Sequence, residues 1–529
     1  MMHSDKAISL IYPEPVLSCD HLFISSGDFK TLLGNYLYNR ELDLSTFMTD
    51  DLETIRYRQE IFADLLHEPR LVKLFEEIIP MLENIDELYR LRENSHQTEG
   101  QIYSIKLIEI YITFINTIFG KMNECEDCIK SRSLLQFAQI IRDVVLCDEF
   151  QSLVENTKKL SKEINEVKSI TIGLNLDPTF TPYEFGILSL NNEYVVSNNF
   201  MDRLIKKDDP HKLSALCPLK ITSRSLTKEE RRFAEMAMSS TLNRLLKSSI
   251  RDWEPAIKAF FRQNTKNFLP LIKELKFLLF GANILKGLQE KKLPLSIPVV
   301  KPKTEKAFRV KGIYHPILAS QKIKITFSDI EFDENGMIYI MTGPNSGGKT
   351  IFTSSIGICQ IFVQLGFLVP GKHAEISPVD RIFVCFTNQV NAMNKGRLEE
   401  ECVKMKEIFN HLSEYSLVLM DETFSSTSSF EGAHIAFDVL SGLSAYACKA
   451  VYSTHMHELT SMISTINGQK EALSKVDTLT VGIDGEGNRT YEVIRAVPDG
   501  KSYARSISDK FGLSYEAILN QIRRQNKTG

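Results

Sequence analysis

A glycine-rich run in the second half of the chain could bind phosphate. It fits the pattern G-x-x-x-x-G-K-[ST] completely, with the residues Gly343, Pro344, Asn345, Ser346, Gly347, Gly348, Lys349 and Thr350. Glycines let backbone N–H groups wrap phosphates at the amino end of a helix, where the helix dipole favours anions. In such a loop Lys349 reaches the β- and γ-phosphate oxygens, and the Thr350 hydroxyl binds Mg²⁺. The run predicts a site for ATP and Mg²⁺; the alternative is a plain turn before a helix.

Two adjacent carboxylates follow an apolar segment farther along the chain. The segment Leu417 to Met420 reads as a buried strand, and it leads directly into Asp421 and Glu422. In a nucleotide site Asp421 would hold Mg²⁺ through water, and Glu422 would polarise the attacking water. The alternative for an Asp-Glu pair is a solvated turn, but its position after a strand and its distance from the glycine-rich run favour the catalytic interpretation.

A histidine ends the next predicted strand. Ser453 and Thr454 precede His455, and the strand should lie beside the one that carries the phosphate loop. This placement predicts that His455 faces the γ-phosphate, whereas an isolated histidine is more often a structural residue. We interpret His457, which has no such argument, as structural.

The elements that position these residues are expected to change in kind along the chain. Three- and four-residue hydrophobic spacing predicts helices over Leu44–Gly120, Leu134–Val167 and Leu226–Gln289. The intervening segment Ser169–Pro218 contains prolines and short β-branched alternation, so it predicts a loop with a short strand. The chain before Pro298 therefore reads as mostly helical with a small insertion.

Beyond Pro298 the pattern is typical of a parallel α/β sheet, because apolar strands alternate with helices. A hairpin is predicted across Asp484-Gly485, between Leu479–Ile483 and Thr490–Ile494. The predicted parallel strands are Met337–Met341, Arg381–Phe386, Leu417–Met420 and Ala450–Ser453.

Composition excludes several classes of protein. The 529 residues are 43% hydrophobic and 25% charged, as in soluble globular proteins. The apolar run Leu107–Phe119 is too short to span a bilayer and contains Glu109, so we expect no membrane span. No secretory signal is visible at the N-terminus, which favours a cytoplasmic protein. Nine cysteines without regular spacing favour reduced thiols, and the single CxxC of Cys125 and Cys128 is a weak zinc candidate.

Charge is segregated along the chain. The formal net charge is −4, which argues against a globally basic nucleic-acid binder. Residues 41–90 hold 13 acidic and 5 basic side chains, whereas residues 202–251 hold 6 acidic and 12 basic ones. The basic segment could neutralise DNA phosphates, although a basic helix is usually only a solvated face. The candidate DNA-contacting residues are Arg224, Lys228, Arg231, Arg232, Arg244, Lys247 and Arg251.

These motifs, in this order, resemble a known family. The stretches TGPNSGGKT, GFLVPGKHAEISPVDRIF, EYSLVLMDE, STHMHELT and PDGKSYARSIS resemble the ATPase domain of MutS-type DNA mismatch-repair proteins over about residues 311–524. More weakly, residues 41–300 resemble the helical core of that family with its inserted DNA clamp. The fragments IGLNLD and YHPIL, the latter containing His315 and Pro316, carry this part of the resemblance.

The resemblance implies a fold and a mechanism. It implies a multidomain protein: a mostly α-helical core and lever region with a small β insertion, followed by an α/β P-loop ATPase of the ABC type that forms a homodimer. Residues Gly343 to Thr350 match the family's phosphate loop, Asp421 and Glu422 its magnesium and hydrolysis carboxylates, and His455 its switch histidine. The serine-rich run Ser425–Ser429 falls where the family has a loop facing the dimer partner.

The sequence departs from the family's repair members in three places. The core begins at about position 41, which leaves no room in this sequence for a mismatch-reading domain or connector ahead of it. Triplets such as Phe233-Ala-Glu235 and Phe332-Asp-Glu334 fall elsewhere and are interpreted as chance matches to the family's mismatch-reading triplet. Leu398 stands where the family has a serine that reaches the partner's nucleotide, and leucine cannot donate that hydrogen bond. The small nuclease domain of one branch is also not expected.

The expected domains are an N-terminal segment (1–40), a helical core with a clamp insertion at about 169–250 (41–300), the ATPase (301–500) and a C-terminal helical dimerisation segment (501–529). The leading hypothesis is a dimeric clamp, switched by ATP, that acts on double-stranded or branched DNA. The alternatives are an ATP-driven switch that binds a protein or ribosomal RNA, and a small-molecule P-loop kinase.

Overall fold

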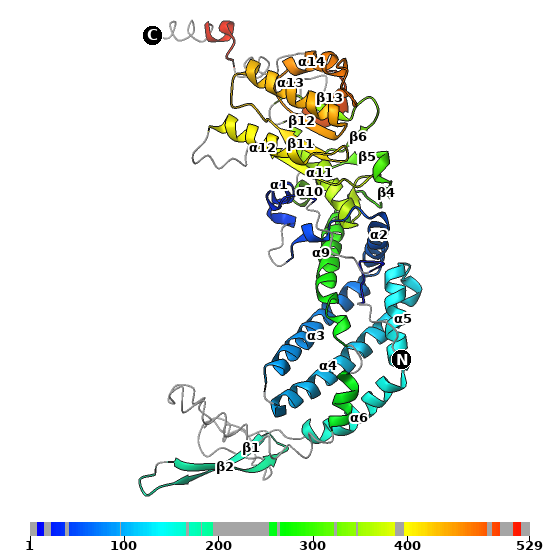
Figure 1. The fold of residues 1–529 in the computed structure, drawn as a ribbon, viewed down its shortest axis with the longest axis vertical. Coiled ribbons are helices and arrows are strands. Elements are labelled where there is room, and N and C mark those ends of the chain that lie inside the picture. Colours follow the sequence, from blue (N-terminus) through cyan, green and yellow to red (C-terminus); the bar gives the residue numbers. More distant parts are fainter. Residues whose placement is uncertain are drawn as a thin grey trace. The chain divides into compact units, whose positions relative to one another are not determined.

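The chain divides into two compact units. A computed structural model describes residues 8–14, 23–37, 42–95, 97–165, 169–180, 182–193, 253–261, 265–321, 325–344, 347–386, 396–483, 489–497 and 512–519 (Figure 1). Unit 1 comprises Met1–Ile8, Arg70–Asp127 and Leu135–Ile272, and unit 2 comprises Ser9–Pro69, Cys128–Leu134 and Lys273–Gly529. As expected, helices predominate among the described residues and the sheets are mixed.

Long helices form most of the described part of unit 1. Their apolar faces meet in an aromatic core in which the Tyr111 ring packs edge-on against Phe260 at 5.3 Å and against Phe150 at 6.1 Å. The three- and four-residue spacing therefore predicted helices correctly among the described residues, whereas residues 226–252 of the predicted helical range Leu226–Gln289 lie outside them. The elements are α3 (Pro69–Glu93), α4 (Gln97–Glu124), η2 (Glu126–Cys128), α5 (Arg132–Leu146), α6 (Asp148–Asn165), a helix at 253–261 and η3 (Thr265–Phe268).

Helix α4 is longer than its apolar run suggested. Because the helix extends beyond Leu107–Phe119 on both sides, its portion Gly100–Glu124 is long and apolar enough to cross a membrane by length and composition, contrary to the sequence prediction. Its side chains Tyr111 and Phe114 are buried in the aromatic core of unit 1. Packing within the unit therefore accounts for part of the apolar composition of this helix, since 44% of the apolar window is buried.

The clamp insertion begins with two strands, not one. Strands β1 (Ser169–Leu176) and β2 (Pro182–Asn191) pair antiparallel, so the sequence prediction of a loop with a short strand was incomplete. Asp177 starts the connecting turn, since its Oδ1 accepts a hydrogen bond from the Thr179 backbone at 2.8 Å. The prolines that suggested a loop lie in this turn and at the first residue of β2, where a strand tolerates them.

The α/β part of unit 2 is built on a six-stranded sheet. The strand order is β10-β11-β12-β7-β13-β14, and all neighbours are parallel except the β13–β14 hairpin. The predicted parallel strands are thus confirmed, and so is the antiparallel pairing of the two predicted hairpin strands, while Asp484 and Gly485 lie outside the described residues. The sheet strands are β7 (Ile338–Thr342), β10 (Ile382–Phe386), β11 (Leu417–Asp421), β12 (Lys449–Ser453), β13 (Val476–Ile483) and β14 (Arg489–Arg495).

Smaller sheets and helices complete unit 2. A four-stranded sheet has the order β4-β9-β5-β6, and β3 pairs with β8. The strands are β3 (Leu295–Ser296), β4 (Val299–Val300), β5 (Phe308–Ile313), β6 (Ser328–Phe332), β8 (Val369–Pro370) and β9 (His373–Ile376). The helices are α1 (Ser26–Leu37), η1 (Leu44–Phe47), α2 (Leu52–His67), α9 (Leu271–Glu290), η4 (Lys303–Glu305), α10 (Pro316–Ser320), α11 (Lys349–Leu365), α12 (Arg397–His411), α13 (Ser429–Tyr446) and α14 (Glu458–Asn467).

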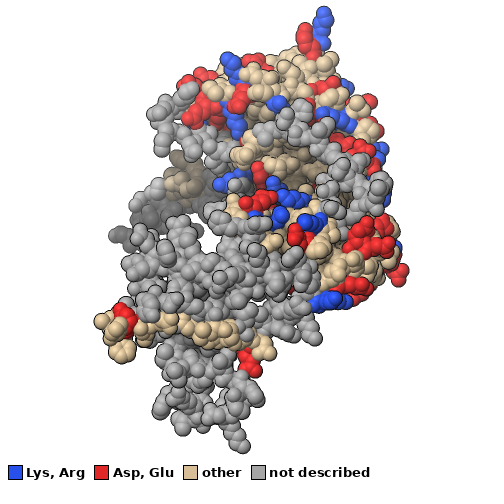
Figure 2. Space-filling view, turned by 60° about the horizontal axis from the view of Figure 1, so that its bottom comes forward, with Lys and Arg blue, Asp and Glu red and all other residues tan. Residues whose placement is uncertain are grey.

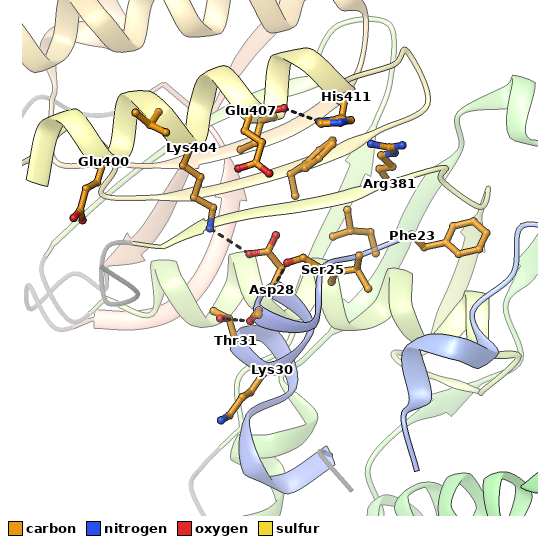
Figure 3. Close-up of a pocket in the computed structure, with 16 residues that line it drawn as sticks. Phe23, Ser25, Asp28, Lys30, Thr31, Arg381, Glu400, Lys404, Glu407 and His411 are labelled. Atoms are coloured by element: carbon orange, nitrogen blue, oxygen red, sulfur yellow. Dashed lines mark hydrogen bonds and ion pairs between the residues drawn. The ribbon is translucent and has the colours of Figure 1, made fainter. Parts of the chain in front are cut away.

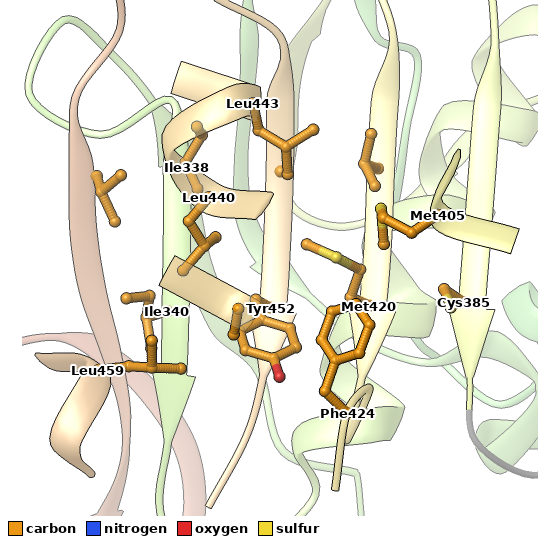
Figure 4. Packing of buried hydrophobic residues seen from close by; sticks show 14 of the residues in the cluster. Ile338, Ile340, Cys385, Met405, Met420, Phe424, Leu440, Leu443, Tyr452 and Leu459 are labelled. Atoms are coloured by element: carbon orange, nitrogen blue, oxygen red, sulfur yellow. The ribbon is translucent and has the colours of Figure 1, made fainter. Parts of the chain in front are cut away.

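The six-stranded sheet is covered on both faces. Alternate strand residues, among them Ile338, Met420 and Tyr452, pack with α12, α13 and α14 on one face (Figure 4). The other face carries α11, where an added Cβ on Gly357 would lie 2.6 Å from Leu419 Cδ1. Because a parallel sheet buries both faces, its strands read as continuous apolar runs, which is why the sequence revealed them.

The N-terminal segment covers the free edge of the sheet. Ile24 forms a parallel bridge with Ile382 of the edge strand β10, whose backbone N–H donates to the Phe23 carbonyl at 2.8 Å. Asp28 on α1 accepts the Val384 backbone N–H at 3.4 Å. These contacts satisfy edge groups that could otherwise pair with another chain.

The far end of α11 rests on α2. Gly366 ends α11 with φ +80° in the left-handed region, and an added Cβ would lie 2.4 Å from Arg58 Cβ. Arg58 is fully buried on α2, where its guanidinium donates to the carbonyls of Ile11 and Phe47. The turn at Gly366 therefore requires glycine for both its backbone conformation and its space.

Replacing Gly366 should destabilise unit 2. We expect Gly366→Ala to lower the free energy of unfolding by about 2–4 kcal/mol, because left-handed backbone costs about 1–2 kcal/mol and overpacking about 1–3 kcal/mol. The control is Gly287→Ala inside α9, where an added Cβ meets nothing within 4 Å and should be neutral or slightly stabilising. Urea unfolding followed by circular dichroism measures both. Equal stability of the two variants would contradict this role of Gly366.

Candidate active site

The phosphate-loop residues lie between β7 and α11. Strand β7 is buried throughout and ends at Thr342, and α11 begins at Lys349. Gly348 has φ +90°, a conformation that residues with a side chain rarely adopt, so glycine is needed at this turn into the helix. Asn345 and Ser346, which the motif also includes, lie outside the described residues.

Lys349 is buried and held by the loop. Its Nζ donates to the carbonyl oxygens of Gly343 at 3.1 Å and Pro344 at 3.3 Å. Burial lowers the pKa of Lys349 to about 8, although the carboxylates of Glu422 and Asp421 act in the opposite direction. The ammonium therefore lies at the mouth of the loop, where phosphate oxygens could replace the carbonyls as partners.

Thr350 and Asp421 meet although they are far apart in sequence. The Thr350 hydroxyl donates to Asp421 Oδ2 at 2.6 Å, because Asp421 is the last residue of β11 and faces the first turn of α11. Asp421 Oδ1 is buried and receives no hydrogen bond of ordinary geometry from the described residues. Burial raises the pKa of Asp421. A hydroxyl and an incompletely satisfied carboxylate are the oxygen donors that Mg²⁺ prefers, so these residues fit that ion.

Glu422 has a strained backbone beside this pair. Its φ is +53°, in the left-handed region, and its N–H donates to the Ser453 carbonyl at 2.8 Å. Left-handed backbone at a non-glycine residue costs about 1–3 kcal/mol and is concentrated at functional sites. The carboxylate lies beside His455, whose Nε2 is 2.7 Å from Glu422 Oε1.

His455 completes the cluster. It follows β12, which pairs with β7 as predicted, and its ring nitrogens lie 3.3 and 3.4 Å from Lys349 Nζ. Burial and the neighbouring Lys349 lower the pKa of His455, while Glu422 acts against them. The histidine is therefore predominantly neutral at pH 7. His457 is exposed at the start of α14, away from these contacts among the described residues.

Glu401 supports the loop after β11, and sequence reasoning missed it. This α12 residue is 3% exposed, and its Oε2 accepts from the Phe424 N–H at 2.8 Å and the Ser426 hydroxyl at 3.3 Å. It therefore fixes the beginning of the serine-rich run, whose Ser428 caps α13. Nothing local distinguishes Glu401 from the other acidic residues of α12, so the sequence carried no signal for its role.

Leu398 has a packing role in this structure. It is partly buried against the hydrophobic core that α12 shares with the sheet. The preceding residue, Arg397, forms an ion pair with Glu401, in which Nε lies 3.5 Å from Oε1. Leu398 therefore anchors the start of α12.

A pocket of about 260 Å³ lies over the start of α11. Its lining residues are Gly347, Gly348, Lys349, Thr350, Ile351, Glu422 and Tyr491. The volume suits the phosphate groups of a nucleotide. Tyr491, on β14, belongs to no motif and was missed by the sequence reasoning.

A larger cavity of about 1070 Å³ lies beside the edge strand β10 of the six-stranded sheet. It is bordered by α1, β10 and α12, and the ion pair of Lys404 Nζ and Asp28 Oδ1 at 3.2 Å crosses it (Figure 3). Residues of both charges and apolar side chains line it together. None of the predicted site residues lies there.

The predicted DNA-contacting residues cannot be placed. Arg224, Lys228, Arg231, Arg232, Arg244, Lys247 and Arg251 all lie outside the described residues. The described hairpin of β1 and β2 carries no lysine or arginine, and in Figure 2 it is tan with a few red side chains. Cys125 is buried and Cys128 exposed, and the described residues contain no group of three side chains that could hold a metal ion.

Comparisons with known proteins show which families and proteins this chain resembles. Residues 339–522 match the family model of MutS domain V, an ATPase domain, and residues 50–291 match that of the MutS2 N-terminal domain. Proteins named DNA mismatch repair protein MutS match at 32% identity over 249 residues in Prochlorococcus marinus strain MIT 9301 and at 28% over 330 residues in strain MIT 9312. These matches cover 44% and 58% of this chain, but only 26% and 35% of the relatives.

Proposed function

Because the chain is a MutS-like protein, we propose that it is an ATP-dependent DNA-binding protein whose ATPase has the P-loop arrangement of the ABC type. The observation that carries the ATPase part is the convergence of three separate segments. The first segment is the start of α11 with Lys349 and Thr350, and these two residues line one pocket with Glu422. The second segment is the end of β11, where Asp421 accepts a hydrogen bond from Thr350 and Glu422 follows. The third is the end of β12, where His455 contacts Lys349 and Glu422.

The chemistry follows from what each side chain can do. Lys349 would exchange the loop carbonyls for the β- and γ-phosphate oxygens of ATP. Thr350 and Asp421 would hold Mg²⁺, which when bound neutralises developing charge on the phosphates. Glu422 would orient and polarise the attacking water, and neutral His455 would hold the Glu422 carboxylate in place and sense the terminal phosphate.

DNA binding is supported by the names of the relatives and by one basic segment. The relatives are named for DNA mismatch repair, and residues 202–251 hold 12 basic and 6 acidic side chains. We propose that this segment binds phosphates of double-stranded or branched DNA. We also propose that two chains form a dimer through residues 301–500, and that residues 501–529 contribute to the dimer interface. ATP binding would close such a dimer around DNA, and hydrolysis would reset it. We propose a cytoplasmic protein that does not read single mismatches.

The rate of ATP hydrolysis with different nucleic acids tests this function. We expect linear duplex or four-way-junction DNA to stimulate hydrolysis at fixed salt, and Lys349→Ala to abolish MgATP binding, with the exposed Lys470→Ala as control. Equal rates of ATP hydrolysis with and without every DNA probe would contradict the proposed coupling to DNA. Unchanged MgATP binding by Lys349→Ala would remove the ATP site itself.

A second candidate partner is a protein or a structured RNA. The described hairpin carries two carboxylates, Asp177 and Glu184, and no basic residue, and Phe180 in its turn is 82% exposed. This surface suits an apolar protein contact better than a phosphate backbone. A structured RNA probe belongs in the same panel, because stimulation by RNA alone would favour this candidate over DNA.

A further inference from the structure

Two residues of the phosphate pocket lie outside the motifs: Ile351, which directly follows the phosphate loop, and Tyr491, which comes from a distant strand. Tyr491 lies in the middle of β14, is 50% exposed, and lines the pocket together with Gly348, Lys349 and Glu422. An added Cβ on Gly348 would lie 3.7 Å from Tyr491 Cδ1. The aromatic ring therefore borders the phosphate loop at the point where α11 begins.

Backbone strain singles out the same residue. Six of the seven non-glycine residues with positive φ in the described chain end helices or lie in turns and bends: Phe180, Lys292, Lys306, Glu422, Phe424 and Ala447. The remaining one is Tyr491, which lines the phosphate pocket together with Glu422. Tyr491 has φ +60° within a strand, between Arg489 and Val493, where the pairing with β13 shifts register. Such strain, of about 1–3 kcal/mol, points to a functional constraint.

The hairpin brings Tyr491 to the pocket. The β13–β14 pairing shifts register between Val481 and Ile483. A β-bulge of this kind changes the direction in which a strand residue points its side chain. Val481 packs against the loop, since an added Cβ on Gly343 would lie 3.1 Å from Val481 Cβ. Arg489 on β14 is close enough for its charge to contribute to the lowered pKa of Lys349. The hairpin is thus one wall of the site.

We propose that Tyr491 positions the nucleotide: its ring closes the phosphate pocket on the hairpin side and contacts the triphosphate. This inference rests on the proposed ATPase function. The ring shares the pocket with Glu422, the proposed hydrolytic carboxylate, so its contact is with the terminal phosphate end. The affinity for ATP should therefore depend on Tyr491 more strongly than the affinity for ADP does.

Variants that accept the left-handed backbone separate this role from a structural one. Glycine and asparagine tolerate positive φ, so Tyr491→Gly and Tyr491→Asn remove the ring without adding strain. We expect both to bind MgATP about tenfold more weakly, and MgADP within about threefold of wild type, with an unchanged melting temperature. Tyr491→Phe keeps the ring and should stay within about threefold for both. Ile494→Ala, an exposed truncation on the same strand, should change neither affinity.

Isothermal titration calorimetry with MgATP and with MgADP measures these affinities for each variant. Lys349→Ala is measured in the same way. If Lys349→Ala loses MgATP while folded Tyr491→Gly and Tyr491→Asn keep wild-type affinity, this inference is wrong and the ATP site stands. Equal weakening of ATP and ADP would also overturn it, because the contact would then not be with the terminal phosphate. If Lys349→Ala binds as wild type does, the proposed function itself fails.

Discussion

Glu422→Gln should abolish ATP hydrolysis while preserving ATP binding. We expect the hydrolysis rate to fall about 100- to 10,000-fold, the range that a positioned general base contributes. Glutamine keeps the shape of the side chain and can still hydrogen-bond His455, but it cannot accept a proton from water. MgATP affinity should stay within about threefold of wild type, because Lys349 and Thr350 are unchanged.

Two measurements check this result. Single-turnover hydrolysis gives the chemical rate, and equilibrium titration gives the affinity of the same variant for MgATP. Glu492→Gln, an exposed carboxylate on β14, is the matched control and should hydrolyse ATP at the wild-type rate. A Glu422→Gln enzyme that retains more than about a tenth of the wild-type rate would show that another residue activates the water.

Lys449→Met should stabilise the protein at pH 6 and lose that advantage at high pH. Lys449 is 2% exposed at the start of β12, and its Nζ donates to the Lys306 carbonyl at 3.3 Å. Burial lowers the pKa of Lys449 to about 7, and the nearby Lys306 charge contributes in the same direction. Asp380 and Cys448 act in the opposite direction but do not offset burial. The buried ammonium is therefore a cost in the folded state.

The direction of the pH dependence follows from the two protonation equilibria. The ordinary pKa of lysine, near 10.5 in the unfolded chain, lies above the folded value of about 7. Between these values the unfolded chain binds a proton that the folded protein has released, so stability rises with pH across this window. Below pH 7 both states are protonated and the full cost of burial remains. At about 1.36 kcal/mol for each pKa unit, that cost is about 2–5 kcal/mol.

Urea unfolding of wild type and Lys449→Met at pH 6, 8 and 10 tests this. The difference in unfolding free energy should be largest at pH 6 and should shrink toward pH 10, where the wild-type lysine is neutral in the folded state. Lys470→Met, at an exposed position, should show no such pH-dependent difference. A constant difference between wild type and Lys449→Met at all three pH values would contradict the lowered pKa.

The candidate ATP site was predictable from sequence because its motifs are local. A glycine-rich turn between a buried strand and a helix, and carboxylates at a strand end, depend on neighbouring residues in the chain. The parallel sheet was predictable for a similar reason, since its buried strands are apolar runs separated by helices. The contacts of Thr350 with Asp421 and of His455 with Lys349 depend in addition on the order of β11, β12 and β7 in the sheet.

The sequence by itself determined which residue types the phosphate-binding segments contain, the helical first half and the strands of the sheet. Only the tertiary structure decided that Tyr491 borders the phosphate loop, that Glu401 holds the turn after β11 and that Ile24 bridges the edge strand. Each of these contacts depends on strand order, register and helix packing, which no local pattern encodes. A single tyrosine or glutamate is an ordinary surface residue in sequence, and it acquires its role only when another element is packed against it.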